Sequence, residues 1–132
     1  MDEQKKDDPI YREFLLDHYK NPKNKRVIEH ADIHKKDENP LCGDSIEIFI
    51  KVGNDNIIED ISFQGSGCVI SMASASILID ELKGKSLEDV EKMSREDMLK
   101  LLGLELTPTR VKCAMLALST MKKGIFENKS KK

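Results

Sequence analysis

The sequence contains no tryptophan, and aromatic residues make up only 5% of its 132 residues. It has no apolar run long enough to span a membrane, and the charged stretch Met1–Asp8 lacks the apolar segment of a signal peptide. We therefore expect a soluble, cytoplasmic protein with a small core and no membrane partner.

An excess of positive charge is also missing. The formal net charge is -2, although charged residues make up 35% of the chain. Nucleic-acid-binding domains usually carry a strong basic bias, so no nucleic-acid partner is expected. No internal repeat divides the chain, and its length suits a single domain over residues 1–132. The polar ends, residues 1–8 and 128–132, are expected to be flexible tails.

Cysteine is scarce, with three residues in the chain. An odd number excludes a fully paired disulfide framework within one chain, and cytosolic thiols stay reduced. A lone cysteine is most often a small buried hydrophobic residue. That interpretation explains poorly why glycines and charged residues surround each of these three thiols.

Local patterns predict the secondary structure. Alternation predicts two antiparallel strands, one with Ile46, Ile48, Ile50 and Val52 on one face, the other with Ile57, Glu59, Ile61 and Phe63, joined by a turn at Gly53–Asn56. Capping and stop signals predict helices from Asp8-Pro9 to Asn21-Pro22, from Cys68 to Leu82, from Ser86, from Ser94 to Gly103, and from Thr107-Pro108 to Gly124. The polar segment Lys23–Asn39 is expected to be mostly irregular. Early strands and late helices predict an α+β fold, with helices packed on one face of a small antiparallel sheet.

Each cysteine lies where a thiolate can bind metal. Cys68 begins a helix, where free N–H groups and the helix dipole favour negative charge. Cys113 follows the cations Arg110 and Lys112, and it lies off the apolar stripe of the last helix. Cys42 precedes Gly43, whose lack of a side chain allows close approach. The flanking Gly43, Gly67 and Lys112 are therefore candidate neighbours of the site.

Asp44 can share a face with Cys42, because residues i and i+2 point the same way in extended structure. The candidate ligands are Cys42, Asp44, Cys68 and Cys113. Three thiolates and a carboxylate suit either tetrahedral zinc or an iron–sulfur cluster. An oxygen ligand is harder and more exchangeable than a thiolate, so such a set suits a cluster that is meant to leave.

Simpler roles compete for the neighbouring residues. Asp44 can cap a turn, and Lys112 can be a solvated helix residue. The three histidines, His18, His30 and His34, are not arranged at a ligand spacing. His18 is expected to pack within the first helix.

Four ordered motifs carry a resemblance to a known family. They are Asp17-His18-Tyr19-Lys20-Asn21-Pro22-Lys23-Asn24, Asn39-Pro40-Leu41-Cys42-Gly43-Asp44, Gly65-Ser66-Gly67-Cys68-Val69-Ile70-Ser71-Met72-Ala73-Ser74-Ala75-Ser76 and Val111-Lys112-Cys113. From about Tyr11 to Gly124 the chain resembles the IscU/SufU/NifU-type iron–sulfur cluster assembly scaffolds.

The resemblance implies a scaffold and carrier, not an enzyme, with an IscU-like fold. Such proteins build a [2Fe–2S] cluster from iron and from sulfur delivered by an IscS- or SufS-like cysteine desulfurase, and pass it to recipient apoproteins. By motif position, Cys42, Asp44, Cys68 and Cys113 are implied as ligands of the cluster, and Asp44 as the residue that keeps it labile. Cys113 or Cys42 is implied as the acceptor of persulfide sulfur. The cluster can be completed within one chain or shared across a homodimer.

The chain departs from the subfamilies at three places. IscU-type members have histidine where this chain has Lys112, which leaves Asp44 as the favoured fourth ligand. Their chaperone-binding segment Leu-Pro-Pro-Val-Lys appears here as Leu106-Thr107-Pro108-Thr109-Arg110. SufU-type members, which bind zinc and relay sulfur, share the lysine but carry an insertion that the short stretch Gly84–Gly103 does not accommodate. A zinc-dependent sulfurtransferase is therefore the alternative function, and a purely structural zinc domain is a third.

Overall fold

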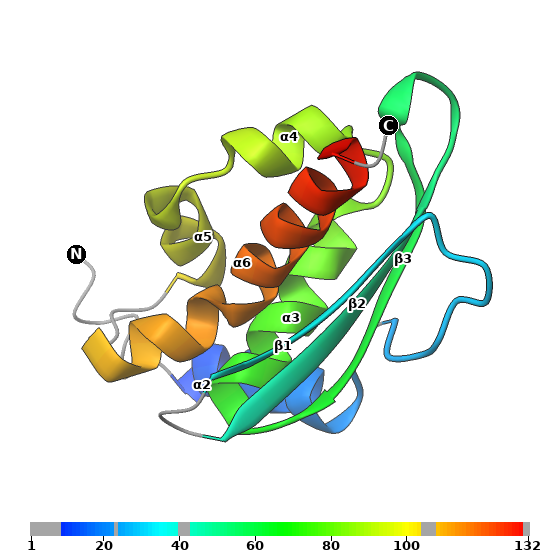
Figure 1. Ribbon diagram of the computed structural model, residues 1–132. Helices are drawn as coiled ribbons and strands as arrows, with labels where there is room; N and C mark the ends of the chain where they lie inside the picture. Colours follow the sequence, from blue (N-terminus) through cyan, green and yellow to red (C-terminus); the bar gives the residue numbers. More distant parts are fainter. Residues whose placement is uncertain (1–8, 23, 40–42, 104–107, 131–132) are drawn as a thin grey trace.

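The computed structural model describes residues 9–22, 24–39, 43–103 and 108–130, which form a sheet with helices on one face (Figure 1). The antiparallel strands lie in the order β1 (Ile33–Asn39), β2 (Asp44–Val52), β3 (Ile58–Ser66). The helices are α2 (Pro9–Lys20), α3 (Val69–Leu82), α4 (Leu87–Lys92), α5 (Arg95–Leu102) and α6 (Pro108–Ser130), and the 3₁₀ turn η1 (Asn54–Asn56) joins β2 to β3. The predicted α+β fold, with helices on one face of a small antiparallel sheet, is confirmed.

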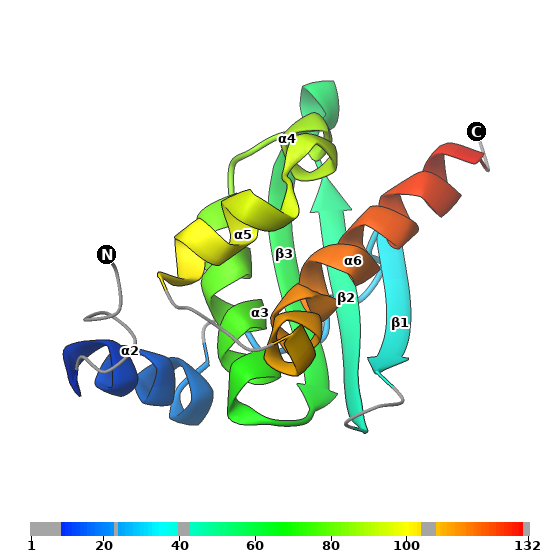
Figure 2. The ribbon, with the colours of Figure 1, turned by 90° about the vertical axis from the view of Figure 1, so that its left-hand side faces the viewer.

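Helices α3 and α6 lie directly against the sheet, and the other helices pack on these two (Figure 2). Every residue from Ser71 to Ile79 of α3 is buried, so α3 is the central helix of the domain. Its alanines and serines allow α2 and α6 to approach closely on two sides, as their small side chains predict. No helix among the described residues is both long enough and apolar enough to cross a membrane.

The isoleucines of β2 form the centre of the core. Ile46, Ile48 and Ile50 alternate along the strand and are at most 1% exposed. Ile48 lies opposite Phe63 of β3, and Ile50 lies opposite Ile61. Burial of each such side chain stabilises the fold by about 1.5–3 kcal/mol relative to an exposed position.

The start of β3 corrects the predicted alternation. Ile57 is 38% exposed, whereas Ile58 is 1% exposed and belongs to the core. The register between β2 and β3 shifts at Lys51/Val52, where a bulge places an extra residue in β3. Ile57 and Glu59 therefore do not share the buried face of Ile61 and Phe63 as the alternation predicted.

The expectation that Lys23–Asn39 is mostly irregular was wrong for its second half, which forms β1. This strand is at the edge of the sheet, and its polar side chains point to solvent or to α6. Lys35 pairs with Glu127 and Asp37 pairs with Lys123, each at 2.7 Å. The strand is stabilised by hydrogen bonds to β2 and by ion pairs to α6. Neither interaction requires alternating apolar residues in β1, so its sequence carries no strand signal.

The predicted end of the last helix at Gly124 was also wrong, because α6 continues to Ser130. Gly124 serves close packing: a Cβ atom there would lie 2.9 Å from Ile33 Cγ2 and 3.1 Å from Lys35 Cβ of β1. Residues 128–130, predicted to belong to a tail, are helical, and Lys129 pairs with Glu91 at 2.8 Å. The other predicted tail residues, 1–8 and 131–132, lie outside the described residues.

The predicted helix signals are confirmed elsewhere. Helix α2 ends before Asn21-Pro22, and α5 ends at Gly103 in the left-handed conformation (φ 68°). Both capping boxes are present. Ser86 and Asp89 exchange hydrogen bonds of 3.1 and 3.0 Å at the start of α4, and Ser94 and Asp97 do so at 3.1 and 2.9 Å in α5.

Several carboxyl groups are stabilised in the ionised form. The backbone N–H of Ser86 lowers the pKa of Asp89 from its usual value, and that of Ser94 lowers the pKa of Asp97 in the same way. The hydrogen bond from Lys123 lowers the pKa of Asp37, and the hydrogen bond from Arg26 lowers that of Asp60. In all four cases the ionised form of the carboxyl group is more stable in the folded chain than in the unfolded chain.

We predict that the protein loses stability in acid. The folded pKa values lie below the unfolded value of about 3.9, so the unfolded chain binds more protons in that range. The contribution is complete above about pH 5 and is lost as the pH falls through the folded pKa values. The midpoints of urea unfolding at pH 7, 5, 4 and 3 measure this loss of stability. The double variant Asp89→Asn/Asp97→Asn should lose less stability in acid than the wild type, with Asp80→Asn as the matched control, and an unchanged acid dependence would contradict this account.

Candidate metal centre

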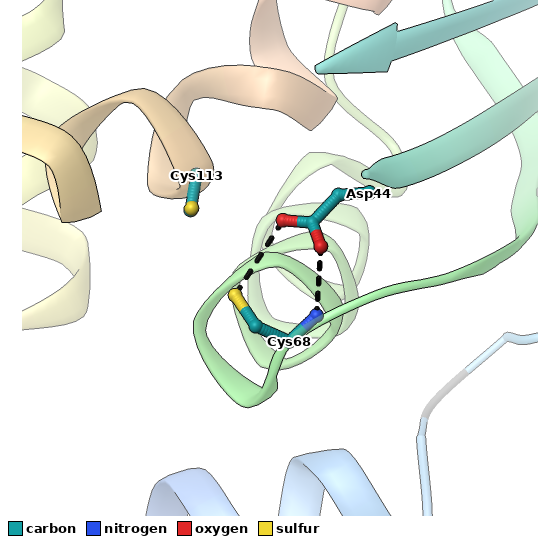
Figure 3. A group of neighbouring side chains, drawn as sticks. All are labelled: Asp44, Cys68 and Cys113. Atoms are coloured by element: carbon teal, nitrogen blue, oxygen red, sulfur yellow. Dashed lines mark hydrogen bonds between the residues drawn. The ribbon is translucent and has the colours of Figure 1, made fainter. Parts of the chain in front are cut away.

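Three of the four predicted ligands meet at one end of the sheet. Asp44 is the first residue of β2, Cys68 immediately precedes α3, and Cys113 lies near the start of α6. Their ligand atoms all lie within 4.8 Å of one another (Figure 3). Segments that are far apart in the sequence therefore place two thiols and a carboxylate together. The fourth predicted ligand, Cys42, lies outside the described residues.

Burial differs among the three. Asp44 is 1% exposed and Cys113 is 3% exposed, whereas Cys68 is partly exposed. Cys113 is buried among the core residues although it lies outside the main hydrophobic cluster, whereas Met115 of the predicted apolar stripe is only partly buried. The predicted stripe therefore does not separate Cys113 from the packing residues of α6. The site is thus enclosed on the side of α6 and accessible at Cys68.

The carboxylate of Asp44 is held by the start of α3. Its Oδ1 accepts a hydrogen bond from the backbone N–H of Cys68 at 2.9 Å, and its Oδ2 lies 3.5 Å from the Cys68 thiol, which donates to it. The hydroxyl of Ser71 also donates to Oδ2. A buried carboxylate is costly unless hydrogen bonds satisfy it, and these donors provide that compensation.

Cys68 is the N-cap of α3, as its position after Gly67 predicted. Its Sγ accepts a hydrogen bond from the backbone N–H of Ser71 at 3.5 Å. The first turn of a helix carries free N–H groups and the positive end of the helix dipole. Cys68 and Asp44 therefore both direct their side chains at a place that favours negative charge.

Gly67 makes this arrangement possible. A Cβ atom at this position would lie 2.5 Å from Asp44 Oδ1 and 2.7 Å from its Cγ, which is far closer than atoms can pack. Gly43 has a different reason to be glycine, since its φ of 71° is in the left-handed region. Both glycines predicted as neighbours of the site thus have a physical role beside Asp44.

The cations predicted beside Cys113 are on the surface. Lys112 and Arg110 are exposed on α6. Lys112 borders a groove between β1 and α6, together with Asn39 and Leu116. A direct contact of Lys112 with the three ligand atoms is not found among the described contacts, so its role as a neighbour stays a prediction.

The three histidines are described residues that do not belong to this group of ligand atoms. His18 is buried, and its Nδ1 lies 2.8 Å from the hydroxyl of Ser76 on α3, which makes it a packing residue of α2. His34 is exposed, pairs with Glu47 and stacks on Phe49 with ring centroids 4.6 Å apart. His30 is exposed in a turn.

Ser71 is a site residue that the sequence analysis did not single out. Its hydroxyl donates to Asp44 and lies 3.3 Å from the backbone carbonyl of Cys113. The available signal was its position three residues after an N-cap, where side chains return toward the cap. Ser71 lies within a recognised motif, but its role becomes visible only when β2 and α6 are packed against α3.

The donor set fits a metal ion that accepts both sulfur and oxygen. Bond lengths of about 2.3 Å to sulfur and about 2.1 Å to oxygen place tetrahedral ligand atoms roughly 3.5–3.8 Å apart. Separations within 4.8 Å therefore need only a small closure. Thiolate and carboxylate together suit zinc or iron better than a purely oxygen-preferring ion such as calcium or magnesium.

Comparison with known proteins agrees with this chemistry. Residues 10–132 match the family described as NifU-like N terminal domain. The chain is 38% identical to the zinc-dependent sulfurtransferase SufU of Bacillus subtilis (strain 168), over 89% of this chain and 90% of that protein. It is 37% identical to the iron–sulfur cluster assembly scaffold protein IscU 1 of Archaeoglobus fulgidus, over 89% of this chain and 76% of that protein. The N-terminal part of a nitrogen-fixing NifU-like protein from Brucella abortus shares the fold, with a TM-score of 0.76 at 16% identity, covering 93% of this chain and 96% of that one.

The two alignments differ in their gaps. Both take in 89% of the 132 residues, which is about 117 residues. The alignment with the Bacillus protein has 135 positions, so about 18 of them have no residue of this chain. The alignment with the Archaeoglobus protein has 118 positions, so only about one of them has no residue of this chain. The chain therefore lacks segments that the Bacillus protein possesses.

We predict that Gly67→Ala damages the metal centre. The added methyl group would displace the Asp44 carboxylate, because overpacking of a buried site costs about 1–3 kcal/mol. Zinc affinity, measured by competition with a chelator, should fall about tenfold or more because a ligand is misplaced. Gly84→Ala at the far end of α3 is the control: it strains a residue with φ 81° but meets no atom within 4 Å. Equal zinc affinity in both variants would contradict the role of Gly67.

Proposed function

The chain belongs to the NifU-like N-terminal domain family of iron–sulfur cluster assembly proteins, and on that premise we propose that it is an assembly scaffold. Its cargo is a labile [2Fe–2S] cluster, built from iron and from sulfur that a cysteine desulfurase delivers. The ligands are Cys42, Asp44, Cys68 and Cys113. The finished cluster passes to recipient apoproteins, so the protein acts as a carrier and not as a turnover enzyme.

The observation that supports this proposal most directly is the mixed donor group formed by Asp44, Cys68 and Cys113. A structural zinc site is normally closed by four soft or borderline ligands. Here one donor is a carboxylate, and one thiol, that of Cys68, is partly exposed. A hard ligand and an accessible edge are properties that favour exchange of the bound group.

Each side chain has a distinct part in this function. The thiolates bind iron, for which sulfur is the preferred ligand in clusters. Asp44 supplies an exchangeable oxygen ligand and adds negative charge next to the thiolates. In sulfur delivery, an acceptor thiolate attacks the outer sulfur of the donor's persulfide, the donor's S–S bond breaks, and the donor leaves as a thiolate.

The acceptor thiolate is either Cys42 or Cys113. Cys113 is 3% exposed, so sulfur transfer to it requires the first turns of α6 to move. The partners of this function are an IscS- or SufS-like desulfurase and the recipient apoproteins. A second copy of the chain is a further partner if the cluster is shared across a homodimer.

A zinc-dependent sulfurtransferase is the second candidate function. The 38% identity to the Bacillus SufU protein and the lysine before the third cysteine favour it. The absence of about 18 aligned residues of that relative disfavours it. This candidate shares the desulfurase partner with the scaffold but holds zinc at the site and forms no cluster.

We predict that the protein purified without oxygen contains iron and acid-labile sulfide in equal amounts, with little zinc. Iron, sulfide and zinc are measured per chain, directly and after anaerobic reconstitution with ferrous iron, desulfurase, cysteine and a thiol reductant. If instead one zinc ion per chain stays bound during reconstitution and the protein strongly stimulates the desulfurase, the scaffold function would be rejected in favour of the zinc-dependent sulfurtransferase.

We predict that Asp44→Ala retains the reconstituted cluster longer than the wild type does. Removal of the carboxylate leaves the thiolates without the hard, exchangeable ligand and without a neighbouring negative charge. The half-time of cluster transfer to an apo-ferredoxin is followed by absorbance, with Asp80→Ala on the exposed side of α3 as the matched control. Equal or faster cluster loss from Asp44→Ala would refute the proposed role of Asp44.

A further inference from the structure

Ser71 lies in the first turn of α3 and contacts all three described members of the metal centre. It is 1% exposed. Its hydroxyl donates to Asp44 Oδ2 and lies 3.3 Å from the Cys113 carbonyl oxygen, while its backbone N–H donates to Cys68 Sγ at 3.5 Å. One buried serine therefore connects the ligands that come from β2, from the start of α3 and from α6.

The hydroxyl of Ser71 has one proton, and the carboxylate is the stronger of its two acceptors because it is charged. Donation from Ser71 holds Oδ2, while the N–H of Cys68 holds Oδ1 at 2.9 Å. The Cys68 thiol also donates to Oδ2, but it must lose its proton to bind a metal ion. The N–H of Cys68 and the hydroxyl of Ser71 are then the donors that set the rotation of the carboxylate. In this orientation Oδ2 faces the thiols and lies 3.5 Å from Cys68 Sγ (Figure 3).

We propose that Ser71 is the residue that positions Asp44 as a metal ligand, an inference that rests on the proposed function of the site. An ionised carboxylate oxygen has two lone-pair sites, so Oδ2 can keep the hydrogen bond from Ser71 while it binds a metal ion. Such hydrogen bonds to ligating side chains orient the ligand, and their loss typically costs 10–100-fold in metal affinity.

Two other serines of α3 show that burial alone does not explain Ser71. Ser76 is 0% exposed and contacts His18, on the side of α2. Ser74 is 1% exposed, and its hydroxyl has no hydrogen-bond partner among the described residues. Ser74→Ala also deletes a buried hydroxyl from α3, but it breaks no hydrogen bond found among the described residues. It is therefore the matched control for Ser71→Ala.

The test is a titration of the metal-free protein with cobalt(II) without oxygen. The sulfur-to-metal charge-transfer absorption reports the thiolates, and the d–d absorption reports the geometry of all ligands. Ser71→Ala should bind cobalt(II) about 10–100-fold more weakly than the wild type, with an altered d–d spectrum, whereas Ser74→Ala should match the wild type. Urea unfolding of each metal-free variant verifies that it folds. If Ser71→Ala does not fold in dilute buffer, all variants are compared in sucrose, which stabilises folded states because it is excluded from the protein surface.

A double-mutant cycle separates positioning from a general structural effect. Because Ser71 acts through Asp44, the variants Asp44→Ala and Asp44→Ala/Ser71→Ala should bind cobalt(II) equally. Wild-type affinity in Ser71→Ala, or an equal loss on deleting the hydroxyl with and without Asp44, would overturn the role of Ser71. A wild-type chain that binds no cobalt(II) would overturn the metal centre as a whole and this proposal with it. A chain that binds cobalt(II) but never assembles a cluster would refute only the scaffold function.

Discussion

The buried carboxylate of Asp44 connects the sheet to the helices at the functional end of the protein. A charge that is 1% exposed is tolerated only when donors compensate for lost water, and here the donors come from the first turn of α3. That requirement sets the approach of β2 to α3 and demands glycine at position 67. It also holds Cys68 beside the carboxylate, and with Cys113 of α6 these residues form the candidate metal centre.

The rest of the fold holds these segments in place. Helix α6 carries Cys113 near its start and crosses β1 near its end, where Gly124 permits contact with Ile33. Ion pairs from Lys123 to Asp37 and from Glu127 to Lys35 connect the same helix to the edge strand. Such exposed pairs contribute little individually, about 0–1 kcal/mol, so the close approach at Gly124 is the tighter contact between this helix and β1.

The chemistry of the site follows from unlike ligands in unlike surroundings. The soft thiolates favour iron or zinc. The carboxylate is a harder ligand, so it binds these metals less strongly and exchanges more readily. Burial at Cys113 protects one side of the bound group, while partial exposure at Cys68 leaves a route for exchange. This combination suits the assembly and release of a cluster that we propose, whereas a permanent structural metal would be better held by a closed set of thiolates.

Local signals in the sequence predicted the helix starts at Ser86 and Ser94, the apolar alternation of β2 and the place of Cys68 at a helix N-terminus, because capping and side-chain periodicity are short-range effects. The motifs also singled out Asp44 and the cysteines as candidate ligands. Only tertiary structure revealed β1, the continuation of α6 past Gly124 and the contact of Ser71 with Asp44. Each of these depends on a partner distant in the chain: β1 on β2 and α6, Gly124 on the approach of β1, and Ser71 on the meeting of three elements. Sequence alone therefore singled out the candidate ligands, and packing decided how Asp44, Cys68 and Cys113 are brought together and which serine contacts them.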